Sequence, residues 1–358
     1  MRICYLADGA SIHTARWCRH FAGLGHEIHL ITFRPAQLEN VQVHYIDAGT
    51  VSPAGGNWKV LLKAGKVKRL LKKIQPDILH AQYATSYGSV GARTGFHPYV
   101  ITALGSDVLI SPQDSRLYRI LLRYAFRRAD WITAMADHMR EAIIRLGVPA
   151  KKVDTVMFGI DPAIFNSRSR SLPAGKFIIT STRNFEPVYN LPLLIEAVRL
   201  AAPGLKGMEL HLVGDGSQRA EVEALVRKAG LEPVTHFYGK IPQPEIARVL
   251  NRSHVFATTS FSDGNNVSLN EAMACGAVSL ATDIPANRQW ISEGVNGFLV
   301  PVDQPQALAD KIAYVYHHYE ALQKSALELN ERVIRERALW SKNMAVVEKK
   351  YQELSGKS

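Results

Sequence analysis

The sequence has few cysteines and no long hydrophobic run. Its 358 residues include three cysteines, Cys4, Cys18 and Cys275, and none of them forms a CxxC pair. This odd number favours free, buried thiols in a reducing compartment over disulfides or a zinc site. About 18 consecutive apolar residues occur nowhere, and the opening segment turns polar too early for a signal peptide. We therefore expect a cytoplasmic protein without a membrane span.

Several common ligand motifs are also missing. The chain has no GxxxxGK[ST] loop, no D-x-D motif and no cluster of His, Cys and carboxylate residues, so we expect no metal and no cofactor. Gly214-Asp215-Gly216 follows an apolar run but lacks the third glycine and the ribose-binding acid of a dinucleotide fingerprint. A plain strand-to-helix turn is the simpler interpretation of these glycines.

The chain does have the composition of a folded, two-domain protein. Hydrophobic residues make up 47% and charged residues 21%, and a single core seldom grows beyond about 300 residues. Apolar runs alternate with amphipathic stretches, and the alternation restarts near Lys176 after a polar run at 166–175. This pattern predicts an α/β fold of two doubly wound Rossmann-like domains that face each other across a cleft. We expect them at 1–168 and 169–335, with a helix at 336–358 that packs back towards the first domain.

Positive charge is concentrated in the first half. Residues 1–168 hold 22 Lys and Arg against 12 Asp and Glu, whereas the second half is nearly balanced. Such an excess indicates an anionic partner: nucleic acid, lipid headgroups or a phosphorylated substrate. Two predicted basic helices, at 59–73 and 116–128, suit an anionic membrane surface, with a solvated helix face as the alternative.

The most informative stretch runs from Ser260 to Ala277. It follows an apolar run, opens with a Gly-Asn-Asn turn and carries Glu271 eight residues after Asp263. Here the chain resembles the family 4 (group 1) glycosyltransferases of the GT-B fold, whose signature is an acid, seven residues, and a glutamate before Ala-Met-Ala-Cys-Gly. The chain has Asp263 where the family usually has glutamate.

This resemblance implies a role for each residue of the stretch. Asp263 and Asn265 would face the transferred sugar, beside Gly264 in the turn. Asn266 and Val267 would offer backbone N–H groups, and Glu271 would bind the ribose of the nucleotide.

The resemblance extends to the segment after the first strand of the second domain. Arg183 matches a family cation that binds the leaving diphosphate, whereas Tyr189 stands where lysine is common. Either Arg183 stabilises more of the charge, or Tyr189 and Asn190 donate hydrogen bonds instead. Relatives bind the base with the backbone that corresponds to Lys240 and Ile241. We also assign Gly214 to the donor side.

The acceptor side carries weaker signals. Relatives often have a histidine where this chain has Leu104, which leaves His13 and Asp107 as acceptor-side candidates. A lone histidine in the first turn of a helix is more often a cap or a core-edge residue than an acid or base, and helix capping is the alternative role for Asp107.

Together with the absence of metal motifs, the resemblance implies a metal-independent glycosyltransferase, and the resemblance alone implies that it retains the anomeric configuration. Its donor would be a nucleotide sugar, with a uridine diphosphate sugar as the first choice and a guanosine diphosphate sugar as the second. Its acceptor would be a lipid-linked or cell-surface glycan. A GT-B phosphorylase, synthase or epimerase is one alternative, and a non-catalytic sugar-nucleotide binder is another. A nucleic-acid-binding protein would explain the basic half but would leave Arg183, Asp263 and Glu271 without a role, so we expect no nucleic-acid partner.

Overall fold

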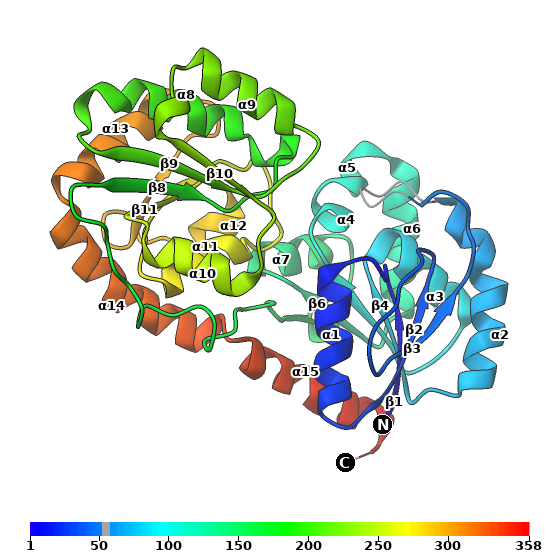
Figure 1. Ribbon diagram of the computed structural model, residues 1–358. Helices are drawn as coiled ribbons and strands as arrows, with labels where there is room; N and C mark the ends of the chain where they lie inside the picture. The colour runs from blue at the N-terminus through cyan, green and yellow to red at the C-terminus, as the bar shows by residue number, and fades with distance from the viewer. Residues whose placement is uncertain (52–57, 358) are drawn as a thin grey trace. The chain divides into compact units, whose positions relative to one another are not determined.

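The computed structural model describes residues 1–51 and 58–357 (Figure 1). The chain divides into two compact units: unit 1 comprises Met1–Met157 with Met344–Ser358, and unit 2 comprises Phe158–Asn343. Each unit contains one parallel β-sheet with helices on both faces. Such sheets bury both faces, which agrees with the continuous apolar runs of their strands.

The sheet of unit 1 has seven strands within the described residues, in the order β3-β2-β1-β4-β5-β6-β7. All neighbouring pairs are parallel. The strands are β1 (Arg2–Leu6), β2 (Glu27–Thr32), β3 (Gln42–Tyr45), β4 (Ile78–Gln82), β5 (Tyr99–Ala103), β6 (Trp131–Ala134) and β7 (Val153–Thr155).

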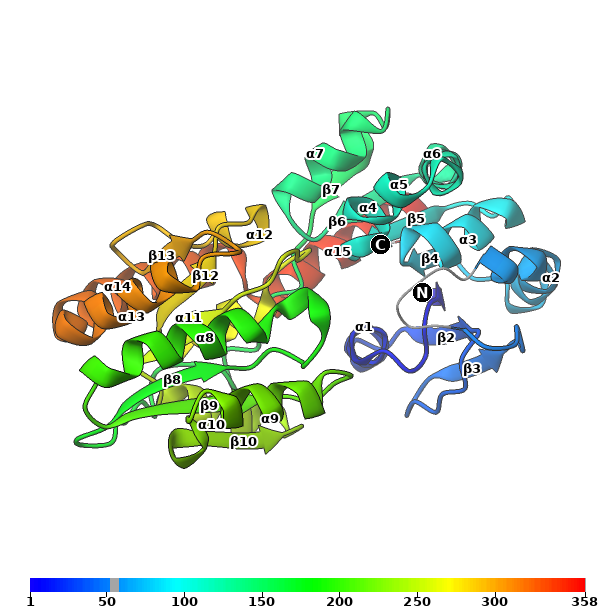
Figure 2. The ribbon, with the colours of Figure 1, turned by 90° about the horizontal axis from the view of Figure 1, so that it is seen from above.

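Helices cover the two faces of this sheet. Helices α2, α3 and α6 pack side by side along one face, where Figure 2 shows them in a row, and right-handed crossovers direct α1 to the opposite face. Tyr351 of α15 is fully buried there, with its ring 5.3 Å from that of Phe21. The α-helices in or entering unit 1 are α1 (Ile12–Gly23), α2 (Ala64–Ile74), α3 (Ser89–Thr94), α4 (Ser106–Leu109), α5 (Ser111–Asp114), α6 (Arg116–Arg128), α7 (Asp137–Arg145) and α15 (Trp340–Ser355).

The sheet of unit 2 has six strands in the order β10-β9-β8-β11-β12-β13, again all parallel. Its strands are β8 (Phe177–Ser181), β9 (Met208–Val213), β10 (Thr235–Gly239), β11 (Val255–Thr258), β12 (Val278–Thr282) and β13 (Gly297–Val300). This order reverses direction between β8 and β11, and ligands of such sheets bind beyond the carboxyl ends of the strands at that switch point.

The helices of unit 2 form two layers. Helices α8, α9 and α13 lie on one face of the sheet, and α10, α11 and α14 lie on the other (Figure 1). Their bounds are α8 (Leu191–Ala201), α9 (Arg219–Lys228), α10 (Gln243–Asn251), α11 (Val267–Ala274), α12 (Pro285–Arg288), α13 (Pro305–His317) and α14 (Tyr319–Arg337). The core between them is mostly aliphatic and includes Ile179, Leu210 and Val255.

Shorter helices connect these elements. Five of those in the described chain are 3₁₀ turns: η1 (Trp58–Lys63), η3 (Ala150–Lys152), η4 (Pro187–Tyr189), η5 (Ala202–Gly204) and η6 (Glu232–Val234). A π-helical turn, η2 (Ala84–Gly88), follows β4.

The unit boundaries differ from those expected from the sequence. Residues 158–168 group with unit 2 because they pack against the segment that leads into α15. Ile160 forms a β-bridge with Leu339, and a Cβ atom at Gly159 would lie 2.7 Å from the carbonyl oxygen of Ala338. The polar run at 166–175 is therefore part of unit 2.

No helix in the described part of the chain is long and apolar enough to cross a membrane.

Candidate active site

The switch point of unit 2 brings two segments together that are 80 residues apart in the sequence. Arg183 lies two residues beyond the end of β8, and Asp263 lies in the loop between β11 and α11. Because β8 and β11 are neighbours in a parallel sheet, both segments leave it at the same edge.

Arg183 is the centre of this arrangement. It is only 7% exposed, its Nη2 donates to Asp263 Oδ2 at 2.6 Å, and its Nη1 donates to Asn266 Oδ1 at 2.9 Å. The ring of Tyr189 lies against the guanidinium, with its centroid 3.9 Å from Cζ. These three contacts fix the direction of the guanidinium before any substrate binds.

Asn266 connects Arg183 to helix α11. Its Oδ1 also accepts from the backbone N–H of Leu269, which caps the helix, and its Nδ2 donates to Thr258 and Asn287. The N-terminus of α11 is thereby held beside Arg183. A helix N-terminus next to an arginine is a favourable environment for a phosphate.

Two buried donors near this point have no protein partner within the described residues. One is Arg183 Nε, and the other is Asn265 Nδ2, whose amide oxygen accepts from the indole N–H of Trp290 at 3.3 Å. Buried donors are nearly always satisfied in native proteins, so these two suit an oxygen-rich ligand.

Other residues of the stretch support the loop. Glu271 is buried on α11, and Gly264 is buried in the turn. The Val267 N–H bonds to the Asn265 carbonyl oxygen at 2.9 Å, so the expected backbone donor is already engaged within the turn.

Tyr189 and Asn190, which the sequence suggested as hydrogen-bond donors to the diphosphate, make other contacts in the structure. Asn190 adopts a left-handed conformation, with φ of 47°, and its Nδ2 donates to the carbonyl of Val302. Tyr189 stacks on Arg183 through its ring. A lysine at this position would repel Arg183, whereas an aromatic ring stabilises it.

Gly214 allows two loops to approach each other. Its φ is 136°, and a Cβ atom there would lie 2.7 Å from the carbonyl oxygen of Arg183. The backbone after β9 therefore packs directly on the Arg183 segment. Lys240 and Ile241 follow β10, and their side chains are exposed and half-buried respectively.

The acceptor-side candidates lie in unit 1. Asp107 is fully buried, and its carboxylate accepts from the backbone N–H groups of Ala84, Leu104 and Gly105. Burial raises the pKa of Asp107, although these bonds oppose the shift. The carboxylate thus holds two loops together.

His13 lies in the first turn of helix α1, where burial and then Arg16 lower its pKa to about 4. The imidazole is therefore neutral at pH 7. The sequence analysis missed Gln82, which ends β4 and accepts from Thr14 Oγ1 at 3.2 Å through its Oε1. Its Nε2 is buried without a partner in the described chain. A polar residue that ends an otherwise apolar strand is the signal that could have identified it.

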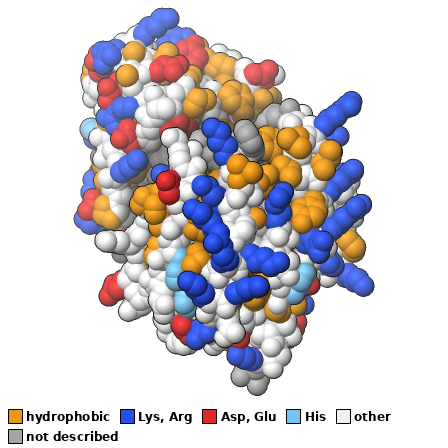
Figure 3. Space-filling view, turned by 90° about the vertical axis from the view of Figure 1, so that its right-hand side faces the viewer, with side chains coloured by type: hydrophobic (Ala, Val, Ile, Leu, Met, Phe, Trp, Pro, Cys, Tyr) orange, Lys and Arg blue, Asp and Glu red, His pale blue; other side chains and the backbone are white. Residues whose placement is uncertain are grey.

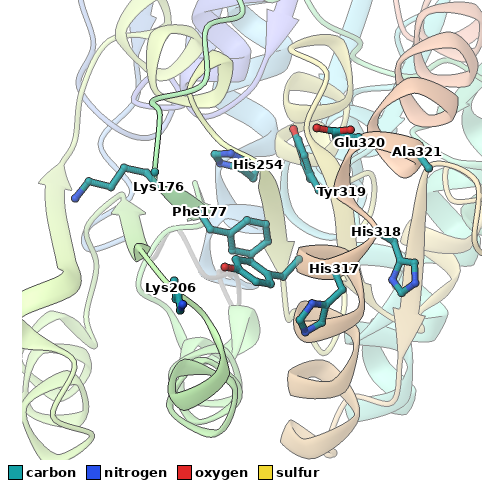
Figure 4. A pocket seen from close by; sticks show the side chains of 11 residues that line it. Lys176, Phe177, Lys206, His254, His317, His318, Tyr319, Glu320 and Ala321 are labelled. Carbon is teal, nitrogen blue, oxygen red and sulfur yellow. The ribbon is translucent and has the colours of Figure 1, made fainter.

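An open cavity of about 690 Å³ lies elsewhere in unit 2 (Figure 4). Its lining includes Lys176, Phe177 and Lys206 at the amino ends of β8 and β9, together with His254 and Tyr319. Because Arg183 follows the carboxyl end of β8, this cavity is separate from the predicted donor site.

Comparisons with known proteins identify the family. Residues 2–136 match the family described as glycosyl transferase 4-like, and residues 164–334 match the glycosyl transferases group 1. The N-acetyl-alpha-D-glucosaminyl L-malate synthase of Bacillus anthracis is 26% identical over 333 residues, which cover 86% of this chain and 84% of the relative.

Solved structures share the fold over nearly the whole chain. A sucrose-phosphate synthase from Thermosynechococcus elongatus has a TM-score of 0.84 and 18% identity, and 99% of each chain is covered. HepE of Anabaena, solved in complex with UDP, has a TM-score of 0.81 and 19% identity, and the comparison covers 99% of this chain and 100% of HepE. With a family match in each half and this fold throughout, the chain belongs to the group 1 glycosyltransferases and is a glycosyltransferase with the GT-B fold.

Proposed function

We propose that this enzyme transfers a sugar from a nucleoside diphosphate sugar, with retention of anomeric configuration and without a metal in the transfer step. The observation that carries this proposal is the Arg183–Asp263 pair beside the N-terminus of α11, at the switch point of unit 2. The charge that grows on the leaving diphosphate would be stabilised by the guanidinium and the helix dipole, which need no metal ion.

The proposed step takes its stereochemistry from the resemblance to the family. The bond between the anomeric carbon and the diphosphate oxygen breaks, and the acceptor hydroxyl attacks on the same face. The hydroxyl proton passes to an oxygen of the departing phosphate. In this proposal Asp263 faces the sugar, Arg183 contacts the diphosphate and Glu271 binds the ribose. The acceptor hydroxyl is the attacking group, and no covalent intermediate forms on a carboxylate.

The proposed donor is a uridine diphosphate sugar, with a guanosine one as the second choice. The UDP bound to HepE supports this order. In a thermal-shift panel with chelator present, a nucleotide at 100 times its dissociation constant should raise the free energy of unfolding by about 2.7 kcal/mol.

Arg183→Ala should abolish this shift, whereas Arg199→Ala is a matched control because Arg199 forms an exposed ion pair with Glu196 on α8. Stabilisation by the nucleotide only when magnesium is added would contradict the metal-free proposal. Incubation of the donor alone separates a transferase from an epimerase by the product formed.

We further propose that unit 1 docks on an anionic membrane, where it meets a lipid-linked or cell-surface glycan acceptor. Helices α2 and α6 both pack against α3, and neither the segment 59–73 nor α6 contains an acidic residue. Figure 3 shows Lys and Arg side chains gathered with exposed hydrophobic ones on this side of the molecule. Leu62 is 78% exposed, and Leu117 and Ile120 are 59% and 63% exposed. Exposed cations with apolar neighbours suit a lipid surface, where each cation contributes about 1 kcal/mol.

Vesicle sedimentation tests this docking. The protein should sediment with vesicles that contain acidic lipids, and salt should release it. Replacing Lys66, Lys72 and Arg123 with glutamate should also release it, whereas the same change at three exposed cations of unit 2 should not. Transfer to a soluble acceptor should survive both sets of changes. Equal recovery with neutral and acidic vesicles would favour a soluble acceptor.

A further inference from the structure

We propose that Glu209, His211 and His236 form a binding site for a divalent transition metal of the zinc type, separate from the donor site. One ligand atom from each residue lies within 4.8 Å of the other two. The sequence gives little sign of this site, because His236 is 25 residues beyond His211. The sheet brings them together.

The strand geometry explains the convergence. Glu209 and His211 are two residues apart on β9, so their side chains share one face of the sheet. His236 on β10 lies directly opposite His211 in the parallel register. All three residues therefore point to the same side of the two strands at the edge of the sheet.

The distances between the ligand atoms suit a small metal ion. Glu209 Oε2 lies 3.1 Å from His211 Nε2 and 3.7 Å from His236 Nε2. Ligands about 2.1 Å from a tetrahedral zinc ion lie about 3.4 Å from each other, which is between these two values. Two imidazoles and one carboxylate leave a fourth position for water.

Neighbouring side chains orient the ligands. Tyr238 Oη lies 3.2 Å from His211 Nδ1, so this nitrogen can donate to the phenol oxygen while Nε2 presents its lone pair to the metal. Lys176 lies 2.7 Å from Glu209 Oε1, which keeps the other oxygen directed at the histidines. Metal-binding histidines and carboxylates typically form a hydrogen bond through the polar atom that does not face the metal.

Lys176 is the cation nearest to the proposed ligands. Its ammonium group contacts Glu209 Oε1, whereas Oε2 of the same carboxylate faces the two histidines.

A bound metal would link β9 to the edge strand β10. Strand β10 is paired only with β9 in the described sheet and leads into Lys240 and Ile241, which are proposed to meet the base of the donor. The metal would therefore stabilise this edge without taking part in sugar transfer. Its effect is measurable as binding and stability, independently of activity.

The test uses the full chain with Zn²⁺ and with Co²⁺. Calorimetry should give one equivalent of Zn²⁺, and at 100 times the dissociation constant the melting temperature should rise by roughly 5 °C. Co²⁺ should show the intense visible absorption of a four- or five-coordinate ion. His236→Ala, at a half-exposed position, should weaken binding at least about 100-fold, and Tyr238→Phe about 10-fold.

A matched control separates this site from other surface histidines. His317 and His318 are adjacent and exposed on or next to α13, and replacing both with alanine should leave the binding curve unchanged. If His236→Ala binds Zn²⁺ as the wild type does, or if the double variant loses the binding, the proposal is wrong. The three residues then form a hydrogen-bonded cluster only.

Discussion

The two units have the same strand order around their switch points but place different chemistry there. In unit 2 the ends of β8 and β11 are joined by the Arg183–Asp263 ion pair. In unit 1 the corresponding region holds an uncharged pair, Thr14 with Gln82 at the end of β4, and an ion pair of Asp8 beyond β1 with Arg34 beyond β2. Further cations of unit 1 are exposed on α2 and α6.

Under the proposed function, one topology serves two partners. A diphosphate needs fixed cationic donors in a water-poor place, because electrostatic interactions are stronger there. A hydroxyl acceptor needs neutral hydrogen-bonding groups, and the unpartnered Gln82 Nε2 is one. We infer that strand order determines where a ligand binds, and that a few side chains at the strand ends determine which ligand it is.

The largest expected effect is the loss of the cationic centre of unit 2. Arg183→Ala should lower kcat by about 10²–10³-fold, because a donor that stabilises charge in the transition state is removed. Glu271→Ala should also lower turnover strongly through the lost ribose contact. Steady-state kinetics with the preferred donor measures both effects, and circular dichroism checks the fold.

Arg183→Lys sharpens this test because it keeps the charge but loses the planar fork that contacts Asp263 and Asn266 together. We expect activity between that of the alanine variant and the wild type. Normal activity in both Arg183→Ala and Glu271→Ala would remove the donor site from this part of unit 2.

A second, smaller effect concerns the buried histidine of unit 1. His80 is fully buried between Tyr351 and Thr102, and burial lowers its pKa from 6.5 to about 3. Below pH 6.5 the unfolded chain binds a proton that the native ring does not, so this stability is present above pH 6.5 and is lost as the pH falls towards 3. At pH 5 the loss is about 2 kcal/mol relative to pH 7.

Chemical denaturation of wild type and His80→Gln at pH 7 and pH 5 measures this loss. The glutamine variant should be less stable at pH 7 but should lose less stability on acidification, because glutamine does not titrate. Parallel pH dependence of the two proteins would show that His80 is not responsible for the acid sensitivity of unit 1.

The smallest expected effect concerns the ring beneath Arg183. Tyr189→Leu should lower kcat/KM about 5-fold, since a partly desolvated cation–π contact contributes about 1 kcal/mol. Tyr189→Phe keeps the ring and should retain wild-type kcat/KM. A similar loss in both variants would assign the role to the phenol hydroxyl, one of the two alternatives from the sequence analysis.

Much of the fold could be predicted because each strand and helix has a local pattern. Strands such as Ile78–Gln82 are short segments buried along their whole length, whereas helices such as Arg116–Arg128 have one apolar face, and parallel strands require helical crossovers. The boundary between the units was harder to predict, since the packing of Gly159 and Ile160 against residues 338–339 joins distant parts of the chain. No local signal reports such a contact.

The same distinction applies to the site. The sequence alone was enough to recognise the segment from Asp263 to Glu271 and its resemblance to one family, because these residues lie within one loop and the helix that follows it. Only the tertiary structure paired Arg183 with Asp263 and placed Tyr189 beneath it, and only the register of β9 and β10 aligned His211 with His236. A strand's sequence indicates which face a side chain occupies, but its neighbour is decided by strand order, which depends on the packing of the whole sheet.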